Sequence, residues 1–447
     1  MKQRIANKEN GAGPLRKIIE QARMEHGISM TELTVLAIQN DPYRQDTPAG
    51  HEVARWFAEQ IQRFVQFGSV HLRGLHYLIS SSDDVLKVNG KPYENNDLDW
   101  TWLQEHASKA ARWLGYVAWD RIIDQRNERP KIYVPDNETR TGWKAGEGAF
   151  IQMPVSAEAA LPRPWASFEA RQAYRIILFG EKTSLDSILL PVAQQVGGEL
   201  LLPTGESSET MVAEMASRIA ADGRPAVILY FSDFDPAGRQ MAVSVARKVQ
   251  AHRDLSYPEL TIELHPVAMT LEQVKRYGLP STPLKETERR ADRWREVMGH
   301  EQTEIDAMIA LHPNELRRIA QDAVRPFFDR TLKGRALEAQ QEWEQEANAR
   351  MRAHPRYREA LSRLSDAIDT LREAPADTLH EASERFEALQ QELGDQLAAG
   401  IDLPEIVLPE PEIDTSTVPR PLFTTDDDYV TATRRLIDHK KLNGEHD

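Results

Sequence analysis

Acidic side chains follow two apolar segments that have the length and composition of buried strands. Glu181 directly follows YRIILFG (174–180), and Asp233 and Asp235 follow AVILYFS (226–232). Because residues two apart in an extended segment point the same way, Asp233 and Asp235 can converge with Glu181. Clustered carboxylates repel one another unless a cation lies between them, and Mg²⁺ prefers oxygen ligands. The pattern predicts a site for Mg²⁺, or for Mn²⁺, that would stabilise charge on a phosphate.

Arg73 and Tyr77 form a second pair that could do chemistry, four residues apart in HLRGLHYLI (71–79). On a helix these positions share a face. A phenol with a pKa of about 10 is a poor nucleophile at neutral pH. A guanidinium beside it favours the phenolate and can also hold a phosphate. From the residues alone, a tyrosine on a short amphipathic helix is usually a partly buried core residue, and a nucleophile with its helper is the alternative.

Other residues near these two sites are weaker candidates. His76, next to Tyr77, is either a local acid or base or a surface residue. Tyr93 and Tyr116 are poorer candidates, because no Arg lies four residues before Tyr93 and Tyr116 lies beyond the helix predicted at 99–114. Lys182, next to Glu181, either contacts a phosphate or is a solvated surface lysine. An Asp-x-Asp pair after a strand is common in structural roles, and the combination with Glu181 and the following Pro-x-Gly turn favours the metal.

The carboxylates require a sheet that brings their strand ends together. Apolar runs alternate with amphipathic stretches at 174–180, 184–196, 199–203, 208–221, 226–232, 237–250 and 260–269. Uninterrupted apolar strands alternating with helices predict a Rossmann-like parallel sheet covered on both faces, hence an α/β fold. The carboxyl ends of such strands open onto a shared crevice where ligands bind. We place this metal-binding domain at residues 165–330.

The tyrosine requires a separate helical domain, placed at residues 51–164 after an N-terminal extension at 1–50. Apolar residues at helical spacing predict helices at 51–66, 72–80 and 99–114, the last capped by Asp99, and GYVAWDRIID (115–124) predicts one or two short strands. Three helices followed by a β wing indicate a winged-helix-like DNA-binding domain. Its third helix, with Lys109, Arg112 and Trp113, would face a DNA groove. An unspecified small helical domain is the alternative.

Beyond the α/β domain, residues 331–400 predict a helical arm and 401–447 a Pro-rich linker with a polar tail. Residues from 335 onward contain 25 acidic and 13 basic side chains, so they account for most of the net charge of -15. The rest of the chain is near neutral, and net charge therefore neither supports nor excludes a nucleic-acid partner.

Composition excludes several classes of site. The sequence contains no cysteine, which rules out disulfides, Cys-zinc sites and thiol nucleophiles and is compatible with a reducing cytoplasm. No apolar run reaches about 18 residues, so no membrane-spanning helix is expected. The first residues lack the apolar stretch of a secretory signal. A cytoplasmic protein without a membrane partner is the expectation.

Three motifs carry a resemblance to a known family. FGEK (179–182), LLPTG (201–205) and YFSDFDPAG (230–238) resemble the Toprim domain. Together with the upstream Arg-x₃-Tyr, the chain most resembles the DNA-cleaving subunit of topoisomerase VI and its meiotic double-strand-break relative. The segment at 304–324 resembles the closing helical region of that family, which implies a structural role for Glu304 and Asp306.

The resemblance implies a topoisomerase-like enzyme that cleaves DNA. Glu181, Asp233 and Asp235 would bind Mg²⁺, Tyr77 would attack the backbone of double-stranded DNA, and Arg73 would steady the phosphate. In the family the tyrosine and metal of different protomers meet, so a homodimer is implied, and an ATPase or another protein of a larger complex is the implied partner. One departure is that His76 stands where the family has an aromatic residue.

Two alternatives remain open from the sequence. The first keeps the metal site without the tyrosine and gives a Toprim nuclease that hydrolyses DNA with water. The second is not enzymatic, and the chain would then be a DNA-binding or assembly module. The nucleophile separates the first alternative from the leading hypothesis, and metal binding separates the second.

Overall fold

The computed structural model describes residues 17–443 except 18, 22, 66–67, 124–128, 136–137 and 149–155. Two compact units are formed, each from separate stretches of the chain. Unit 1 comprises Met1–Val134, Tyr174–Phe327 and Thr415–Asp447, and unit 2 comprises Pro135–Ala173 and Phe328–Asp414. These limits differ from the predicted domain boundaries at 164, 330 and 400. Both helices and a mainly parallel sheet are present, so the predicted α/β class is confirmed.

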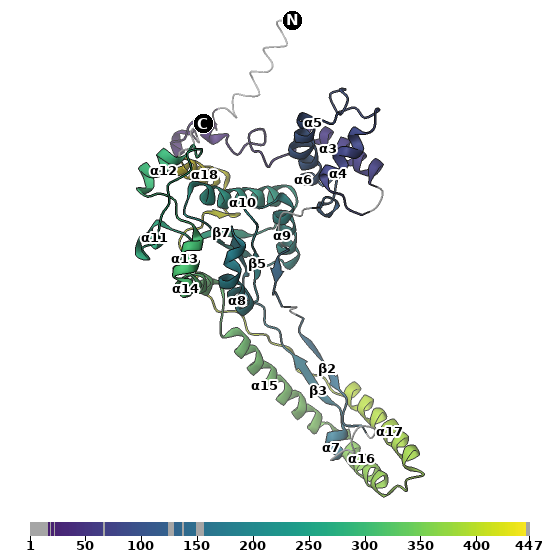
Figure 1. Ribbon diagram of the computed structural model, residues 1–447. Coiled ribbons are helices and arrows are strands. Elements are labelled where there is room, and N and C mark those ends of the chain that lie inside the picture. Colours follow the sequence, from purple (N-terminus) through teal and green to yellow (C-terminus); the bar gives the residue numbers. More distant parts are fainter. Residues whose placement is uncertain are drawn as a thin grey trace. The chain divides into compact units, whose positions relative to one another are not determined.

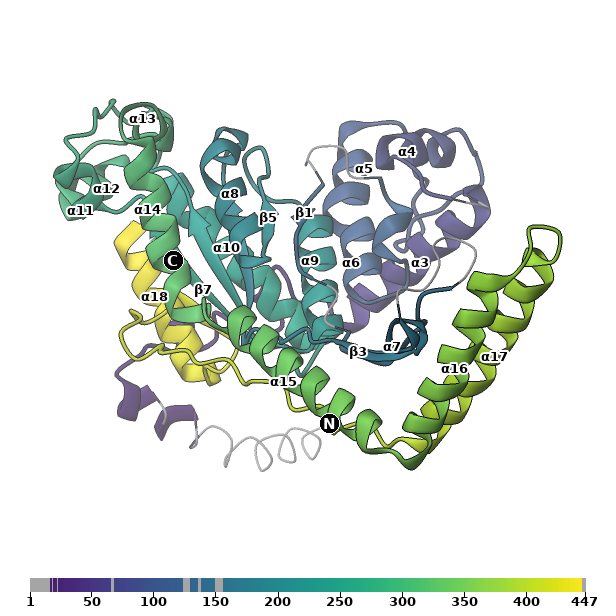
Figure 2. The same cartoon turned by 90° about the horizontal axis from the view of Figure 1, so that it is seen from below.

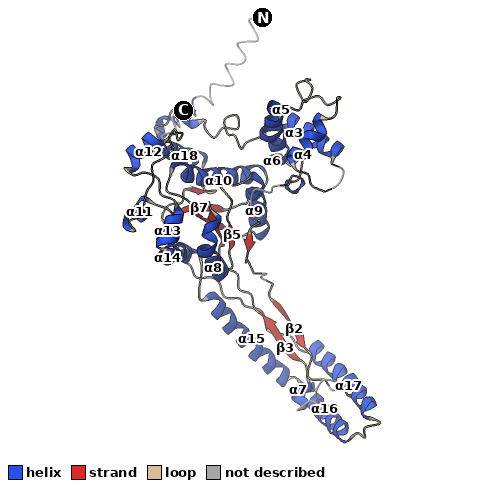
Figure 3. Cartoon of the chain, viewed as in Figure 1, coloured by secondary structure: helices blue, strands red, loops and turns tan. Residues whose placement is uncertain are grey.

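A six-stranded sheet forms the centre of unit 1, with the strand order β1-β5-β4-β6-β7-β8. The bounds are β1 (Lys131–Ile132), β4 (Arg175–Gly180), β5 (Glu199–Leu201), β6 (Ala226–Phe231), β7 (Ile262–Ala268) and β8 (Phe423–Thr424). The four inner strands are parallel, and both outer strands are antiparallel to their neighbours. Figure 3 shows these strands in red. The inner four lie where the apolar runs predicted them.

Three helices connect the parallel strands: α8 (Asp186–Val196), α9 (Glu209–Asp222) and α10 (Pro236–Leu255). Helix α8 connects β4 to β5 on one side of β4. Helix α9 then connects β5 to β6 on the other side of β4, and α10 connects β6 to β7 in the same direction. Since such crossovers are right-handed, α8 covers one face and the other two helices cover the opposite face. Beside α8 lies α14 (Pro313–Val324), which also contacts β7 (Figure 1).

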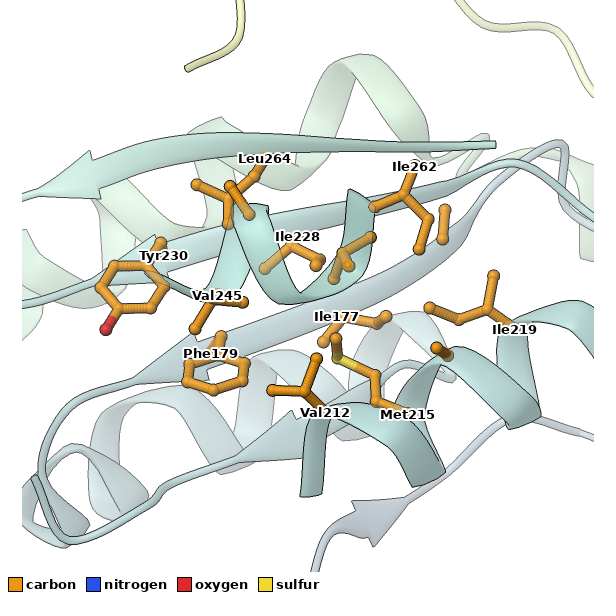
Figure 4. Close-up of a cluster of buried hydrophobic side chains, with 14 of the residues drawn as sticks. Ile177, Phe179, Val212, Met215, Ile219, Ile228, Tyr230, Val245, Ile262 and Leu264 are labelled. Carbon is orange, nitrogen blue, oxygen red and sulfur yellow. The ribbon is translucent and has the colours of Figure 1, made fainter. Parts of the chain in front are cut away.

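The core beneath α9 and α10 fixes how β4 and β6 align. Alternate side chains of the two strands, including Ile177, Phe179, Ile228 and Tyr230, point into this core (Figure 4). The rings of Phe179 and Tyr230 stack with centroids 5.3 Å apart. Burying one such side chain contributes about 1.5–3 kcal/mol, and a shift of one residue would turn each of them to the other face. The last residues of both strands, Gly180 and Phe231, are therefore held side by side.

The N-terminal part of unit 1 is a helical domain with its own apolar core. Its elements are α3 (Pro48–Phe64), α4 (Leu72–Ser80), α5 (Asp97–Trp102), a π-helical segment (Leu103–Ala107) and α6 (Ser108–Trp113). Helices are thus present at the predicted places, but the predicted cap was wrong. The side chain of Asn96 caps α5, whereas Asp99 is buried and binds Lys87. The strands predicted in 115–124 are also wrong for the described residues, because 119–121 form a 3₁₀ turn and Ile122 makes one bridge with Val70.

Helix α6 packs against the α/β domain, which contradicts its predicted role at a DNA groove. Trp113 stacks on His252 of α10 with ring centroids 4.1 Å apart and donates to Glu209 at 2.8 Å. Lys109 pairs with the same carboxylate at 2.8 Å, and Arg112 donates to Thr210. The basic and aromatic side chains of this helix hold two domains together.

The C-terminal stretch returns to unit 1 and completes it. Strand β8 pairs with β7, and α18 (Tyr429–Asn443) follows it. Figures 1 and 2 show α18, in yellow, beside α12 (Ala291–Met298). The predicted polar tail is therefore part of the folded α/β domain. The short helices α2 (Met30–Leu33), α11 (Leu271–Arg276) and α13 (Ile305–Leu311) complete this unit.

The described residues of unit 2 form a two-stranded sheet and four helices. The strands are β2 (Arg140–Lys144) and β3 (Arg163–Ser167), and the helices are α7 (Ala157–Ala160), α15 (Leu332–Ala353), α16 (Pro355–Glu373) and α17 (Leu379–Gly400). Phe168 contacts Trp343 of α15, and α16 packs along α17 around Leu364 and Phe386. No helix among the described residues of either unit is long and apolar enough to span a membrane.

The domain contact around His252 predicts a loss of stability in mild acid. Burial lowers the pKa of His252 to about 4, from the ordinary value of 6.5. The unfolded chain therefore takes up this proton first as the pH falls from 6.5 to 4, which lowers the free energy of unfolding by at most about 3 kcal/mol. We expect His252→Phe, which keeps a ring against Trp113, to show a smaller drop in melting temperature between pH 7.5 and 5 than the wild type. The exposed His380 gives the control variant, and an unchanged drop in His252→Phe would contradict the assignment.

Candidate functional site

Strands β4 and β6 lie side by side, but the chain leaves them in opposite directions. After β4 it turns toward β5, and after β6 it turns toward β7. The helices that follow lie on opposite faces, so the strands' carboxyl ends border a crevice where ligands bind in open α/β sheets. Glu181 is the first residue after β4, and its backbone N–H donates to the Phe231 carbonyl at 2.9 Å. The predicted acidic residues thus lie at this point of the sheet.

The loop after β6 has little freedom. The Asp235 carboxylate caps α10 and accepts the Gly238 N–H at 2.6 Å, and Pro236 occupies the first helical position. A Cβ atom at Gly238 would lie 2.6 Å from the Asp233 carbonyl oxygen. The turn therefore requires glycine for close approach, not for backbone conformation. It holds Asp233 and Asp235 at the start of a long helix.

A distant segment closes over this loop. Phe234 and Thr303 exchange two backbone hydrogen bonds, at 2.9 and 3.1 Å. The Asp233 Oδ1 atom accepts the N–H of Ile305 at 2.8 Å, at the start of α13. These contacts bring Glu304 and Asp306 beside the strand-end carboxylates.

The three predicted carboxylates line one cavity of about 350 Å³. Glu181 and Asp233 are each 8% exposed, and Glu181 Oε2 accepts the Asp233 N–H at 3.1 Å. Burial and the nearby Asp233 and Asp235 carboxylates raise the pKa of Glu181 to about 7. Burial and the charge of Asp233 also raise the pKa of Asp235. Burial and mutual repulsion in the cavity therefore oppose the full ionisation of all three carboxylates near neutral pH.

Lys182 supplies the positive charge at this site. Its ammonium lies 2.9 Å from Asp233 Oδ2, 2.9 Å from Asp306 Oδ2 and 3.4 Å from Glu304 Oε2. Although burial opposes it, the hydrogen bonds that the ammonium donates to Asp306 and Asp233 raise the pKa of Lys182 above its usual value. The lysine is thus an ion-paired member of the site, not a solvated surface residue.

The donor atoms suit a hard divalent cation, but they are not arranged around one. Within the described parts of the chain, no three His, Asp or Glu side chains form a group that could hold a metal ion. Both Asp233 oxygens are engaged, one by the Ile305 N–H and the other by Lys182. Glu181 Oε1 accepts no hydrogen bond from the described residues. The carboxylates fit Mg²⁺ in type and in sharing a cavity, and Lys182 takes part of the place a cation would need.

The predicted tyrosine and arginine lie together on α4. Arg73 Nε donates to the Tyr77 hydroxyl at 3.3 Å, and the guanidinium also stacks over the rings of Tyr77 and Trp100. Tyr77 is 48% exposed. The hydroxyl is therefore reachable and already beside a cation.

His76 is neither a surface residue nor free to act as an acid or base. It is 1% exposed, its Nδ1 lies 2.6 Å from the Tyr93 hydroxyl and its Nε2 lies 3.0 Å from Asn95 Oδ1. With both ring nitrogens engaged, it anchors α4 to the loop before α5. The same contact assigns Tyr93 to the core, whereas Tyr77 is exposed.

The structure does not bring the two predicted groups together within one chain. Neither Arg73 nor Tyr77 lines the carboxylate cavity. Arg73 lines a different groove of about 490 Å³, between the helical domain and α9, together with Lys109 and Lys248. An exposed lysine of the loop before α12, Lys285, does line the carboxylate cavity and was not predicted. No pattern in the sequence marks it, because its position depends on how that loop folds back.

Comparison with known proteins adds no assignment. No protein-family model matches the sequence, and no curated protein is significantly similar to it.

Two glycine substitutions test how tightly the loop is built. Gly238→Ala would press a methyl group against the Asp233 carbonyl and lower the stability by about 1–3 kcal/mol. Gly334 on α15, where an added Cβ would meet no atom within 4 Å, is the matched control. Gly334→Ala should raise stability by about 0.5–1 kcal/mol because alanine favours the helix. Thermal unfolding measures both, and a neutral Gly238→Ala would contradict the close packing.

Proposed function

We propose that this protein cleaves the phosphodiester backbone of double-stranded DNA in a divalent-cation-dependent reaction, with Tyr77 as the nucleophile. The observation that carries the proposal is the convergence of Glu181, Asp233 and Asp235 on one cavity at the sheet's ligand-binding edge. The exposed Arg73–Tyr77 pair supports it, because a phenol next to a guanidinium suits attack on an anionic phosphate. The resemblance to the Toprim domain of the DNA-cleaving topoisomerase VI family supports the same reaction.

The chemistry divides between the two groups of residues. Tyr77 attacks the phosphorus, the bond to one deoxyribose oxygen breaks, and the phenolic proton is passed on while the departing oxygen gains one. The products are a phosphotyrosyl ester and a free hydroxyl end, so the broken bond's energy is conserved. Arg73 holds a phosphate oxygen and favours the phenolate. A bound Mg²⁺ or Mn²⁺ supplies stabilisation of the added negative charge.

Two copies of the chain complete the site in this proposal. Since Tyr77 does not line the carboxylate cavity of its own chain, the tyrosine of one protomer acts at the carboxylates of another. A homodimer on duplex DNA follows, and an ATPase or another protein of the complex would drive any passage of a second duplex. A cytoplasmic protein is consistent with this role.

The separation of Tyr77 from the carboxylates also favours a second function. The protein could be a nuclease in which water, not tyrosine, attacks the phosphate. Glu181, whose pKa is raised to about 7, could then accept a proton from that water near neutral pH. The two functions differ in whether cut ends carry protein.

A plasmid assay separates these functions. Supercoiled DNA is incubated with protein and Mg²⁺ or Mn²⁺, and half of each sample is digested with protease before electrophoresis. We expect Tyr77→Phe to abolish cutting and the protein-linked ends, with a loss of at least about 10³-fold because no other group replaces the nucleophile. Tyr116→Phe, which removes another exposed hydroxyl of the same domain, should cut like the wild type.

The remaining outcomes each decide between the hypotheses. Full cutting by Tyr77→Phe, with ends free of protein, would establish the hydrolytic nuclease. Loss of cutting in Asp233→Asn with Asp235→Asn, but retained DNA binding, is expected under both enzymatic functions. If wild-type protein binds DNA and neither cuts it nor forms adducts, a non-enzymatic assembly role replaces both.

A further inference from the structure

The ammonium of Lys182 is held by carboxylates from two distant parts of the chain. Asp233 comes from the loop after β6, and Glu304 and Asp306 come from the segment that closes over that loop. An ammonium has three donors, and three carboxylates surround this one. The Lys182 side chain is 26% exposed, so these contacts are partly shielded from water. The lysine therefore supplies positive charge to three carboxylates, of which Asp233 belongs to the predicted metal set.

The same contact competes with a metal ion for Asp233. Its Oδ1 caps the start of α13, and its Oδ2 is the atom that Lys182 binds. A divalent ion shared with Glu181 and Asp235 needs one of these oxygens. The backbone hydrogen bond to Ile305 is fixed by the helix, whereas a lysine side chain has a flexible four-carbon stem and moves readily. Lys182 is therefore the partner that can leave.

We propose that Lys182 is a positioning residue that occupies the cation site and gives way to the divalent ion. The ion takes the place of the ammonium on Asp233, and the released ammonium stays within the cavity that it lines, where it can bind a phosphate oxygen of the substrate. No covalent bond is made or broken in this exchange, and the positive charge beside the carboxylates is never absent. The inference deepens the proposed function, since it rests on the metal site.

The exchange has two consequences. Metal binding in the wild type must replace the ion pairs of Lys182, so the affinity is lower than the carboxylates alone would give, on the order of tenfold. By linkage, a phosphate that binds the released ammonium strengthens metal binding, and the metal strengthens phosphate binding by the same factor. The site would therefore assemble fully only when substrate and metal are both present.

Chemical labelling of lysines tests the release directly. The full-length protein is treated briefly with an acetylating reagent at pH 8.5, with and without Mn²⁺, and each lysine is quantified by mass spectrometry. A paired ammonium reacts slowly, so the rate at Lys182 should rise several-fold with Mn²⁺. The exposed Lys333 of unit 2 is the reference and should not change. A rise at Lys182 no greater than at Lys333 would overturn the proposal if calorimetry shows that Mn²⁺ binds.

Calorimetry with Mn²⁺ separates exchange from simple charge removal. Lys182→Met and Lys285→Met each remove one positive charge from the same cavity, but only Lys182 contacts the carboxylates. We expect Lys182→Met to bind Mn²⁺ about tenfold more tightly than Lys285→Met, and Lys182→Arg, which keeps the charge and its hydrogen bonds, to bind like the wild type. Equal affinities for the two methionine variants would overturn the exchange while leaving the metal site intact.

Failure of the metal site itself gives a different result. If neither the wild type nor any variant binds Mn²⁺, the metal site and the exchange are both refuted. Melting temperatures show whether Lys182→Met is folded, because removing the counter-ion leaves the carboxylates to repel one another. If that variant unfolds, the labelling experiment on the wild type decides the question.

Discussion

The main constraint on the candidate site is the repulsion between carboxylates that lie close together at the edge of the parallel sheet. Glu181 and Asp233 are nearly buried at the ends of adjacent strands, with Asp235 beside them. Burial, together with like charges this close, raises the pKa of Glu181 to about 7. A positive charge nearby stabilises the ionised form of such an arrangement. Lys182 provides that charge here, and a divalent ion would provide it more strongly.

The rest of unit 1 holds this charge arrangement in place. The apolar core under α9 and α10 sets the register of β4 and β6, and so the spacing of the residues that follow them. Helix α10 begins at Asp235 and needs Gly238 to approach the strand end. The bridge from Phe234 to Thr303 then brings a second acidic pair within reach of Lys182. The apolar core, the turn after β6 and this bridge thus all position side chains of the candidate site.

Local sequence patterns predicted much of this site, because its strands and helices are determined locally. The apolar runs ending at Gly180 and Ser232 indicated strands, and the order of elements indicated a parallel sheet, so the meeting of three carboxylates could be expected. The spacing of Arg73 and Tyr77 likewise predicted one helical face, and the two side chains are hydrogen-bonded.

Several of the errors concern contacts between residues far apart in the sequence. Lys182 pairs with Asp306, 124 positions away, and nothing near Lys182 signals that partner. We placed Lys109 and Arg112 of helix α6 at a DNA groove, yet they bind Glu209 and Thr210 of the neighbouring domain. His76 looked like a surface residue because its partners, Tyr93 and Asn95, come from a loop whose path periodicity does not determine. Tertiary packing, not local preference, decides such roles.

Anomalous diffraction from crystals soaked in Mn²⁺ would show whether the three carboxylates bind a cation, because it locates the ion without reference to activity. We expect one strong peak between Glu181, Asp233 and Asp235, within coordination distance of an oxygen atom of each, with the Lys182 ammonium moved off Asp233. A fully occupied cavity of ordered water with Lys182 still bound to Asp233, at Mn²⁺ concentrations that saturate the protein in solution, would contradict it.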